Sequence, residues 1–240
     1  MHGDTAYGAG ESVLEAGCGV GAQTVTLAVR SPHARIMSID VSEASLAQAE
    51  QAVRERGLTN VRFARADLLN APFAPETFDH VFICFVLEHL ARPVDALVAL
   101  RQLLKPGGTM TVIEGDHGSA YFSPRSSAAQ DAIACLVRLQ ADAGGDSLIG
   151  RELYPLLRRS GFEDVRVSPR VVYVDGSRPE MIEGFTLRTF TAMVEGVREP
   201  AIAEGLIDAD DFDRGVAALK RTASETGTFC YTFFKAVATK

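Results

Sequence analysis

Three glycines and one aspartate near the start of the chain have the spacing of a nucleotide-binding site. Gly17, Gly19 and Gly21 follow a short apolar run, Ser12 to Ala16, and precede a segment with helical spacing of apolar residues. Glycines at such a strand-to-helix turn let the backbone approach a ligand closely, and the helix presents its first N–H groups to that ligand. Asp40 lies 23 residues after Gly17, where a carboxylate can accept hydrogen bonds from ribose hydroxyls. The pattern predicts a ligand that carries an adenosine.

The glycines alone do not choose between two such ligands. Residues 17–22 (GCGVGA) also satisfy the G-x-G-x-x-G/A fingerprint of dinucleotide-binding proteins. Glu15, however, would repel a pyrophosphate, whereas it would attract the ammonium of an amino-acid tail, directly or through water. A cationic sulfonium ligand is therefore a better electrostatic match than NAD.

These residues require strands and helices that alternate along the first half of the chain. The pattern predicts strands at 12–16, 34–40, 61–64, 78–85 and 109–114, and helices at 22–30, 42–56 and 93–104. Such alternation implies right-handed βαβ crossovers, which build a parallel sheet that is covered on both faces.

The second half has a different pattern. Residues 121–160 look mainly helical with an interruption at Gly144 and Gly145, and two segments, 165–174 and 228–239, look like strands. The long connection 176–227 is rich in helix formers and acids, so we expect a folded helical insertion, a natural candidate for a substrate cover.

Five segments in the first half carry a resemblance to a known family. They are VLEAGCGVG (13–21), SID (38–40), RADLLNAPF (65–73), FDHVFICFVLEHL (78–90) and LLKPGGTMTVIE (103–114). In order and spacing they resemble the motifs of class I S-adenosylmethionine-dependent methyltransferases, and within these the UbiE-like small-molecule branch. The resemblance covers roughly residues 11–115.

The resemblance implies an α/β fold in a single methyltransferase domain, 1–240. This is a Rossmann-like, doubly wound, mostly parallel seven-stranded sheet with an antiparallel C-terminal strand and a helical insertion before it. We expect 11–115 to be the cofactor-binding half and 116–240 the substrate half, with 176–227 as a helical cover. Only about ten residues precede the first predicted strand, whereas members of this family usually have a helical segment there. We therefore expect the cofactor lid to come from the 176–227 insertion or from a partner subunit, unless the start is truncated.

The resemblance also implies S-adenosyl-L-methionine as cofactor and assigns its contacts. These would come from Glu15, Gly17, Cys18, Gly19, Gly21, Gln23 and Thr24 around the glycine loop, from Asp40 and Val41, from Ala66, Asp67 and Leu68, and from Phe85. Asp40 would bind the ribose, Val41 would flank the adenine, and Asp67 would accept a hydrogen bond from the adenine amino group. Glu88 and His89 would lie at the mouth of the substrate site.

Two histidines are candidate catalytic residues. His117 lies just past the predicted fifth strand, at the carboxyl edge where open α/β sheets bind ligands, and a histidine can take a proton from an acceptor near neutral pH. Its alternative role is that of a structural turn residue, and Asp116 either orients its ring or forms the turn. His89 follows the fourth strand and is the second candidate, with a structural role as the alternative.

Several aromatic residues could wall an apolar acceptor pocket. They are Tyr121, Phe122, Tyr154, Tyr173, Phe185 and Phe190, of which we expect two or three to line the site. Tyr231 and Lys235 imitate a dehydrogenase pair, but on a strand they would lie about 13 Å apart. We interpret Cys18 as a small packing residue rather than a nucleophile.

The composition argues against several classes of function and location. The 240 residues carry 24 Lys and Arg against 31 Asp and Glu, a net charge of −7 that argues against a charge-driven grip on nucleic acid. No apolar run is long enough to cross a membrane and the start lacks the pattern of a signal peptide, so we expect a cytoplasmic protein. The four scattered cysteines have no zinc-ligand spacing, which predicts buried thiols and no metal site.

The sequence therefore predicts a methyltransferase that acts on O, N or C of a small, partly apolar acceptor. The alternative is a non-methylating cyclase, isomerase or cofactor-binding module on the same fold, which would keep the cofactor residues equally well. An NAD-dependent oxidoreductase is disfavoured by Glu15 and Asp67. The sequence leaves monomer and homodimer open.

Overall fold

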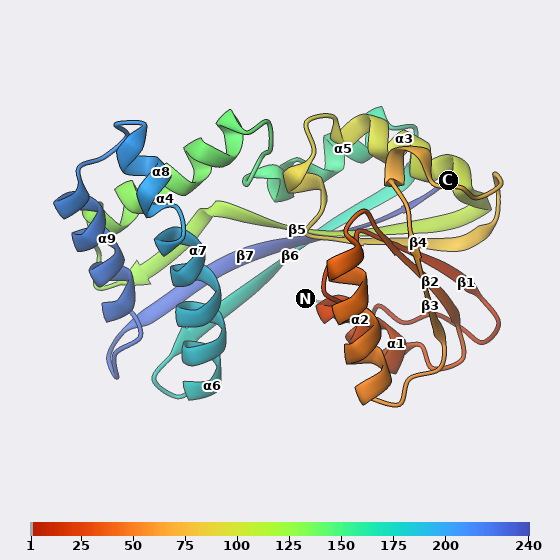
Figure 1. Ribbon diagram of the computed structural model, residues 1–240, viewed down its shortest axis with the longest axis horizontal. Coiled ribbons are helices and arrows are strands. Elements are labelled where there is room, and N and C mark those ends of the chain that lie inside the picture. Colours follow the sequence, from red (N-terminus) through yellow and green to blue (C-terminus); the bar gives the residue numbers. More distant parts are fainter. Residues whose placement is uncertain (1) are drawn as a thin grey trace. The chain divides into compact units, whose positions relative to one another are not determined.

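The computed structural model describes residues 2–240, which form a seven-stranded sheet with the strand order β3-β2-β1-β4-β5-β7-β6 (Figure 1). The strands are β1 (Ser12–Ala16), β2 (Arg35–Asp40), β3 (Val61–Arg65), β4 (Phe78–Cys84), β5 (Leu104–Ser123), β6 (Glu163–Asp175) and β7 (Thr228–Thr239). The α-helices are α1 (Ala22–Arg30), α2 (Glu43–Glu55), α3 (Pro93–Leu103), α4 (Ser127–Asp142), α5 (Leu153–Arg159), α6 (Pro179–Met181), α7 (Ala192–Glu195), α8 (Arg198–Ala203) and α9 (Ala209–Arg221). The predicted fold class is confirmed.

The chain divides into two compact units. Of the described residues, the first unit contains 2–114, 150–168 and 234–240, and the second contains 115–149 and 169–233. Two segments that we expected in the substrate half, 150–168 and 234–240, thus fold with the first unit. The assignment of cofactor binding to 11–115 and of acceptor binding to 116–240 stays a prediction.

Parallel strands build the sheet of the first unit. β1 pairs with β2 and β4, β2 with β3, and β4 with β5, all in parallel. Helices α1 and α2 lie on one face and α3 and α5 on the other, as the crossovers require (Figure 1). The side chains between the sheet and α1 are fully buried; they include Val13, Leu27, Ala28, Ile36 and Phe82.

The C-terminal strand β7 is antiparallel to its neighbour β5. In the first unit, the Lys240 N–H donates to the Gly108 carbonyl near the start of β5. In the second unit, the Thr232 N–H donates to Ser119 Oγ near the end of β5. Because the later residue of one strand meets the earlier residue of the other, the pair is antiparallel.

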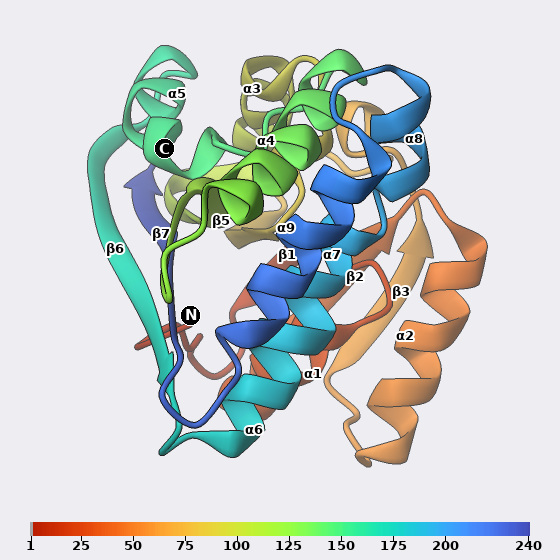
Figure 2. The ribbon, with the colours of Figure 1, turned by 90° about the vertical axis from the view of Figure 1, so that its left-hand side faces the viewer.

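Residues 176–227 are helical, as predicted. They form α6, a π-helix (Ile182–Thr191), α7, α8 and α9. Helices α7, α8 and α9 gather around α4 within the second unit (Figure 2). A role of this insertion as a substrate cover stays a prediction.

β5 is the element that differs most from its prediction. We expected a strand at 109–114, but the observed strand begins at Leu104 and continues to Ser123. Residues 115–119 (GDHGS) are typical of a turn, yet they are extended because β7 pairs alongside them. His117 therefore lies inside a strand and not just past the end of one.

Candidate functional site

The glycine loop connects β1 to α1 in the first unit. Gly17, Gly19 and Gly21 have φ angles of 77°, 51° and 83°, in the left-handed region that favours glycine. A Cβ on Gly17 would lie 2.5 Å from Cγ2 of Val86, and one on Gly21 would lie 2.8 Å from Cα of Ala49. A Cβ on Gly19 would meet no atom within 4 Å. Gly17 and Gly21 thus allow close packing within the protein, whereas Gly19 faces open space.

Asp40, at the end of β2, is bonded to this loop. Its Oδ2 accepts a hydrogen bond from the Gly19 N–H at 2.8 Å, and its Oδ1 accepts one from the Ser42 N–H at 2.9 Å. Each carboxylate oxygen keeps a second lone pair, so the pair of oxygens can still accept from two vicinal hydroxyls. The neighbours Val20 and Val41 leave 50% and 60% of their surface exposed, which offers apolar contact to a planar ring. The site therefore fits an adenosine.

Glu15 is buried more deeply than a residue in direct contact with a ligand needs to be. The β1–β2 register places it opposite Ser38, whose Oγ donates to Glu15 Oε2 at 2.6 Å. The side chain is 2% exposed, and this burial raises the pKa of Glu15 to about 7. A cation bound nearby would favour its ionised form.

Cys18 in the glycine loop is a packing residue. It is buried, and burial together with the charges of Glu15 and Asp40 raises the pKa of its thiol to about 12. A thiol that stays protonated is a poor nucleophile. All four cysteines are free thiols, and Cys230 is partly exposed, contrary to our expectation that all would be buried.

The turn after β4 is held by a buried carboxyl group. Phe85 has a φ of 57°, a conformation that is strained for a residue with a side chain, and its N–H donates to the Ile113 carbonyl. Glu114 Oε1 accepts from the N–H groups of Val86 and Leu87 at 3.0 and 2.8 Å. This contact was not evident from the sequence, because it joins the middle of β5 to the turn that follows β4.

The remaining predicted cofactor residues also belong to the first unit. Asp67 is exposed, and its Oδ1 accepts from the Leu69 N–H at 2.9 Å, which begins a short helical turn at Leu68. The Ala66 N–H donates to the Asp40 carbonyl, so this loop lies beside the end of β2. Gln23 and Thr24 lie in the first turn of α1, which follows the glycine loop directly.

His117 is buried in the second unit. Its ring Nδ1 lies 2.7 Å from Tyr231 Oη, and its backbone N–H donates to the Ser147 carbonyl at 2.9 Å. A Cβ on Gly115 would lie 2.4 Å from Tyr231 Oη, so glycine is needed there to admit the hydroxyl. His117 and Tyr231 are 6% and 2% exposed. From the sequence, Tyr231 was considered only as half of a Tyr/Lys pair with Lys235 and was discarded as such. Its contact with His117 was not foreseen, because a partner 114 residues away leaves no local pattern.

The other polar candidates have different surroundings. His89, in the first unit, leaves 66% of its side chain exposed, and its Nε2 lies 3.5 Å from Oε1 of Glu88, which is buried. Asp116, in the second unit, accepts a hydrogen bond from the Gly118 N–H. This bond is that of an Asx turn, one of the two roles considered for Asp116.

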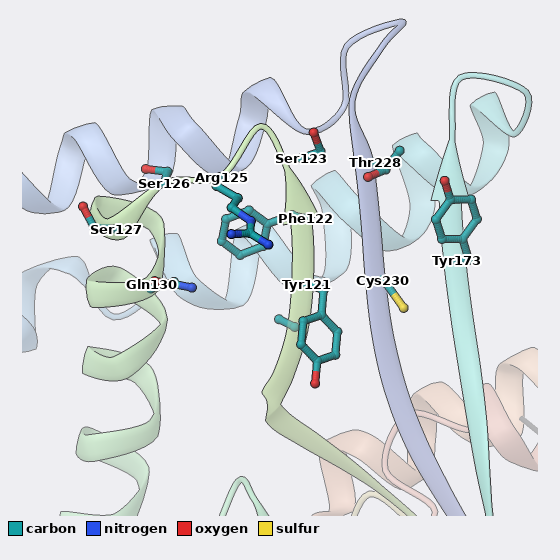
Figure 3. Close-up of a pocket in the computed structure, with 11 residues that line it drawn as sticks. Tyr121, Phe122, Ser123, Arg125, Ser126, Ser127, Gln130, Tyr173, Thr228 and Cys230 are labelled. Carbon is teal, nitrogen blue, oxygen red and sulfur yellow. The ribbon is translucent and has the colours of Figure 1, made fainter.

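The candidate aromatic residues separate into three groups. Phe185 and Phe190 pack with Tyr231 in an aromatic cluster of the second unit, and Tyr154 is exposed on α5 of the first unit. Tyr121, Phe122 and Tyr173 line a cavity of the second unit with a volume of about 570 Å³ (Figure 3). His117 lines a neighbouring cavity of about 430 Å³.

The described residues lack two kinds of feature. Within residues 2–240, no helix is long and apolar enough to cross a membrane. In the same part of the chain, no three His, Cys, Asp or Glu side chains are grouped so that they could hold a metal ion.

The chain is similar to a family of methyltransferase domains and to several curated proteins. Residues 13–108 match a family model described as a methyltransferase domain. The demethylmenaquinone methyltransferase of Geobacillus sp. (strain WCH70) is 33% identical over 106 residues, which are 44% of this chain and 45% of the relative. Three other curated relatives are covered over 34%, 44% and 55% of their length, so the chain spans about half of these relatives or less.

Two solved structures show the fold over nearly the whole chain. The phosphoethanolamine N-methyltransferase 2 of Haemonchus contortus in complex with S-adenosyl-L-methionine has a TM-score of 0.60 at 18% identity, and the match covers 98% of this chain and 49% of that one. The cyclase SpnF has a TM-score of 0.57 at 21% identity, and the match covers 97% of this chain and 75% of that one. The matched segment 13–108 contains every predicted cofactor residue of the first unit.

Proposed function

We propose that this chain is a UbiE-like class I S-adenosylmethionine-dependent methyltransferase, and that it transfers a methyl group from S-adenosylmethionine to O, N or C of a small, partly apolar acceptor. The observation that carries the proposal is the open space at Gly19 beside the Asp40 carboxylate. The match of residues 13–108 to a methyltransferase-domain model supports the class of reaction, and the acceptor and the residues that serve it are our inference.

The first unit would hold the cofactor. S-adenosylmethionine carries its methyl group on a sulfonium, which leaves as a neutral thioether, so positioning and exclusion of water are the main tasks of the protein. Asp40 accepts from the ribose hydroxyls, and Val20 and Val41 provide an apolar surface for the adenine. Gly19 lets the backbone approach the methionine part, and the ionised form of Glu15 attracts its ammonium, directly or through water.

The second unit would serve the acceptor. If the acceptor atom carries a proton, His117 takes it as a general base, with its ring oriented by the contact with Tyr231 Oη. His89 stays a second candidate for this role, since its exposed ring is free to meet a ligand.

The test of the cofactor assignment is a calorimetric titration of the purified chain with S-adenosylmethionine, S-adenosylhomocysteine and NAD. We expect the two sulfur ligands to bind with micromolar affinity and NAD to give no heat. Asp40→Ala should weaken binding of both sulfur ligands by about 2–4 kcal/mol, because two hydrogen bonds to a charged group are lost.

Two controls make this test specific. Asp210→Ala removes an exposed aspartate from the first turn of α9 and should leave the affinity unchanged. Asp40→Asn keeps the size of the side chain, which separates loss of charge from collapse of the loop. Unchanged affinity in both Asp40 variants would sink the assignment.

The test of methyl transfer is release of S-adenosylhomocysteine in the presence of small phenols, amines and activated carbon acids. Release with one of these classes identifies the acceptor atom. Binding without release from any class would favour the alternative of a non-methylating cyclase or binding module on this fold.

A further inference from the structure

The second unit has a cavity of about 570 Å³ at the far end of β5 (Figure 3). It lies between the end of β5, the start of α4 and the neighbouring strands β6 and β7. Its lining residues are Ala120, Tyr121, Phe122, Ser123, Arg125, Ser126, Ser127, Gln130, Tyr173, Thr228 and Cys230. All of them belong to the second unit, so the cavity is complete within it.

The charge of this cavity has one sign. Arg125 is the one charged side chain among the lining residues. Within residues 2–240, no hydrogen bond or ion pair engages its guanidinium, whereas Arg138 and Arg198 of the same unit pair with aspartates. In Figure 3 the Arg125 side chain extends from the loop between β5 and α4 toward β5, and it overlaps the ring of Phe122 in this view. Arg125 is exposed, so its planar group with five N–H donors is open to an acceptor that enters the cavity from solution.

The rest of the lining adds hydrogen-bonding groups and ring surface. Ser123, Ser127 and Thr228 contribute hydroxyl groups, and Gln130 contributes an amide that points into the same space (Figure 3). Tyr121 and Tyr173 leave 67% and 48% of their surface exposed. The cavity therefore offers a cation and neutral donors for an anionic group, together with aromatic surface for an apolar body.

This cavity adjoins the one that His117 lines. Ala120 and Gln130 belong to the lining of both. A molecule with its anionic end at Arg125 can therefore extend past Ala120 and Gln130 toward His117 without leaving the second unit.

We propose that the Arg125 cavity binds a carboxylate or phosphate group of the acceptor, so that the substrate class is a small anionic molecule with an aromatic or aliphatic body. The identification of this anion as the methyl acceptor rests on the proposed function. The presence of an anion site at Arg125 does not depend on it. Arg125 would form a two-pronged contact with two oxygens of the anion, and the hydroxyl groups would bind its remaining oxygens.

The test is calorimetry with three probes on the full chain, in a buffer free of phosphate and sulfate. Phenyl phosphate and benzoate carry the two anionic groups on the same ring, and benzyl alcohol is the neutral counterpart. We expect phenyl phosphate or benzoate to bind and benzyl alcohol to bind at least about tenfold more weakly, and the stronger of the two anions identifies the group.

Matched variants assign the binding to Arg125. Arg125→Gln should weaken the anion by about tenfold or more, and Arg125→Lys should recover part of that loss because it keeps the charge but not the fork. Arg221→Gln removes an exposed arginine outside the cavity, in the last turn of α9, and should change nothing. Equal weakening by Arg125→Gln and Arg221→Gln, or no binding of either anion at millimolar concentration, would overturn the proposal.

A titration with S-adenosylmethionine separates this proposal from the proposed function. Arg125→Gln should bind S-adenosylmethionine as the parent does, since Arg125 lies outside the first unit. If the parent binds S-adenosylmethionine but neither anion, the anion site is wrong and the cofactor assignment stands. If it binds an anion through Arg125 but not S-adenosylmethionine, the reverse holds.

Discussion

The hydrogen bond between His117 and Tyr231 gives the histidine a defined orientation. Both side chains are buried, and the ring of Phe190 lies 5.8 Å from the imidazole, centroid to centroid. In the tautomer with the proton on Nδ1, His117 donates to Tyr231 Oη, so the hydrogen bond sets the orientation of the ring. Tyr231 is then a positioning residue, which acts through His117.

Tyr231→Phe tests this role. We expect kcat to fall by roughly tenfold or more, with the affinity for S-adenosylmethionine unchanged. The phenolic oxygen binds the imidazolium more strongly than the neutral ring, so its loss should also move the acid limb of the pH–rate profile to lower pH. His117→Ala should remove that limb.

Tyr154→Phe is the matched control, because it removes a hydroxyl from an exposed tyrosine of the first unit. If Tyr231→Phe has the same pH–rate profile as the parent protein, the tyrosine only packs in the core. Identical profiles in His117→Ala and the parent would return His117 to a structural role.

Individual site residues could be predicted from sequence to different degrees. Asp40 was found because its distance from the glycine loop is fixed by one strand, one helix and a second strand. The hydrogen bond from Ser38 to Glu15 depends on strand register, and the bond from His117 to Tyr231 depends on β7 lying beside β5. Contacts of this second kind need the tertiary fold, so residue spacing alone cannot predict them.

At the level of elements, the middle of β5 supports the turn after β4. Glu114 is fully buried, and burial together with the charge of Glu88 raises its pKa to about 8. Its Oε1 accepts from two consecutive N–H groups of the turn, which fixes the backbone where Phe85 is strained. A carboxyl group that prefers to stay protonated thus stabilises a turn assigned to the cofactor site.

This arrangement predicts how stability depends on pH. In the unfolded chain the Glu114 carboxyl ionises near 4.5, whereas in the folded protein it stays protonated up to about 8. Between these values the unfolded state binds fewer protons, so the free energy of unfolding falls as pH rises. Glu114 alone should contribute on the order of 3–5 kcal/mol to this loss.

Urea unfolding at pH 5 and pH 8.5 measures this contribution. In Glu114→Gln, which can still accept from the turn, the difference in unfolding free energy between the two pH values should shrink by that amount. Glu50→Gln on the exposed face of α2 is the control. If Glu114→Gln kept the pH dependence of the parent, the carboxyl would be ionised in the folded protein.

The elements themselves were predictable where local signals agree. β1, α1 and β7 have the predicted bounds, because apolar runs, glycine turns and helix-ending residues coincide there. β5 was predicted too short because the glycines and polar residues after Glu114 favour a turn, and pairing with β7 overrides that preference. The π-helix at 182–191 has the same apolar spacing as an α-helix in its sequence, so its form could not be predicted.

At the scale of the whole molecule, three strands pass through both units. The unit boundaries fall inside β6 and β7, after Ser168 and Phe233, and within β5 after Glu114. Unfolding one unit would therefore fray strands on which the other depends. We expect a single cooperative unfolding transition, in contrast to proteins whose domains are joined by linkers.

This coupling predicts that a ligand of the first unit protects the second. S-adenosylmethionine at 100 times its dissociation constant should add about 2.7 kcal/mol to the free energy of unfolding and slow exchange through global unfolding about 100-fold. In hydrogen exchange, the most protected amides of β1 and of residues 229–233 should then slow by the same factor, although the latter belong to the second unit. At the same ligand concentration, Asp40→Ala should reduce both effects to about fourfold slowing or less. Slowing confined to β1 would mean that the units unfold independently, because only global unfolding transmits the stabilisation to amides that do not contact the ligand.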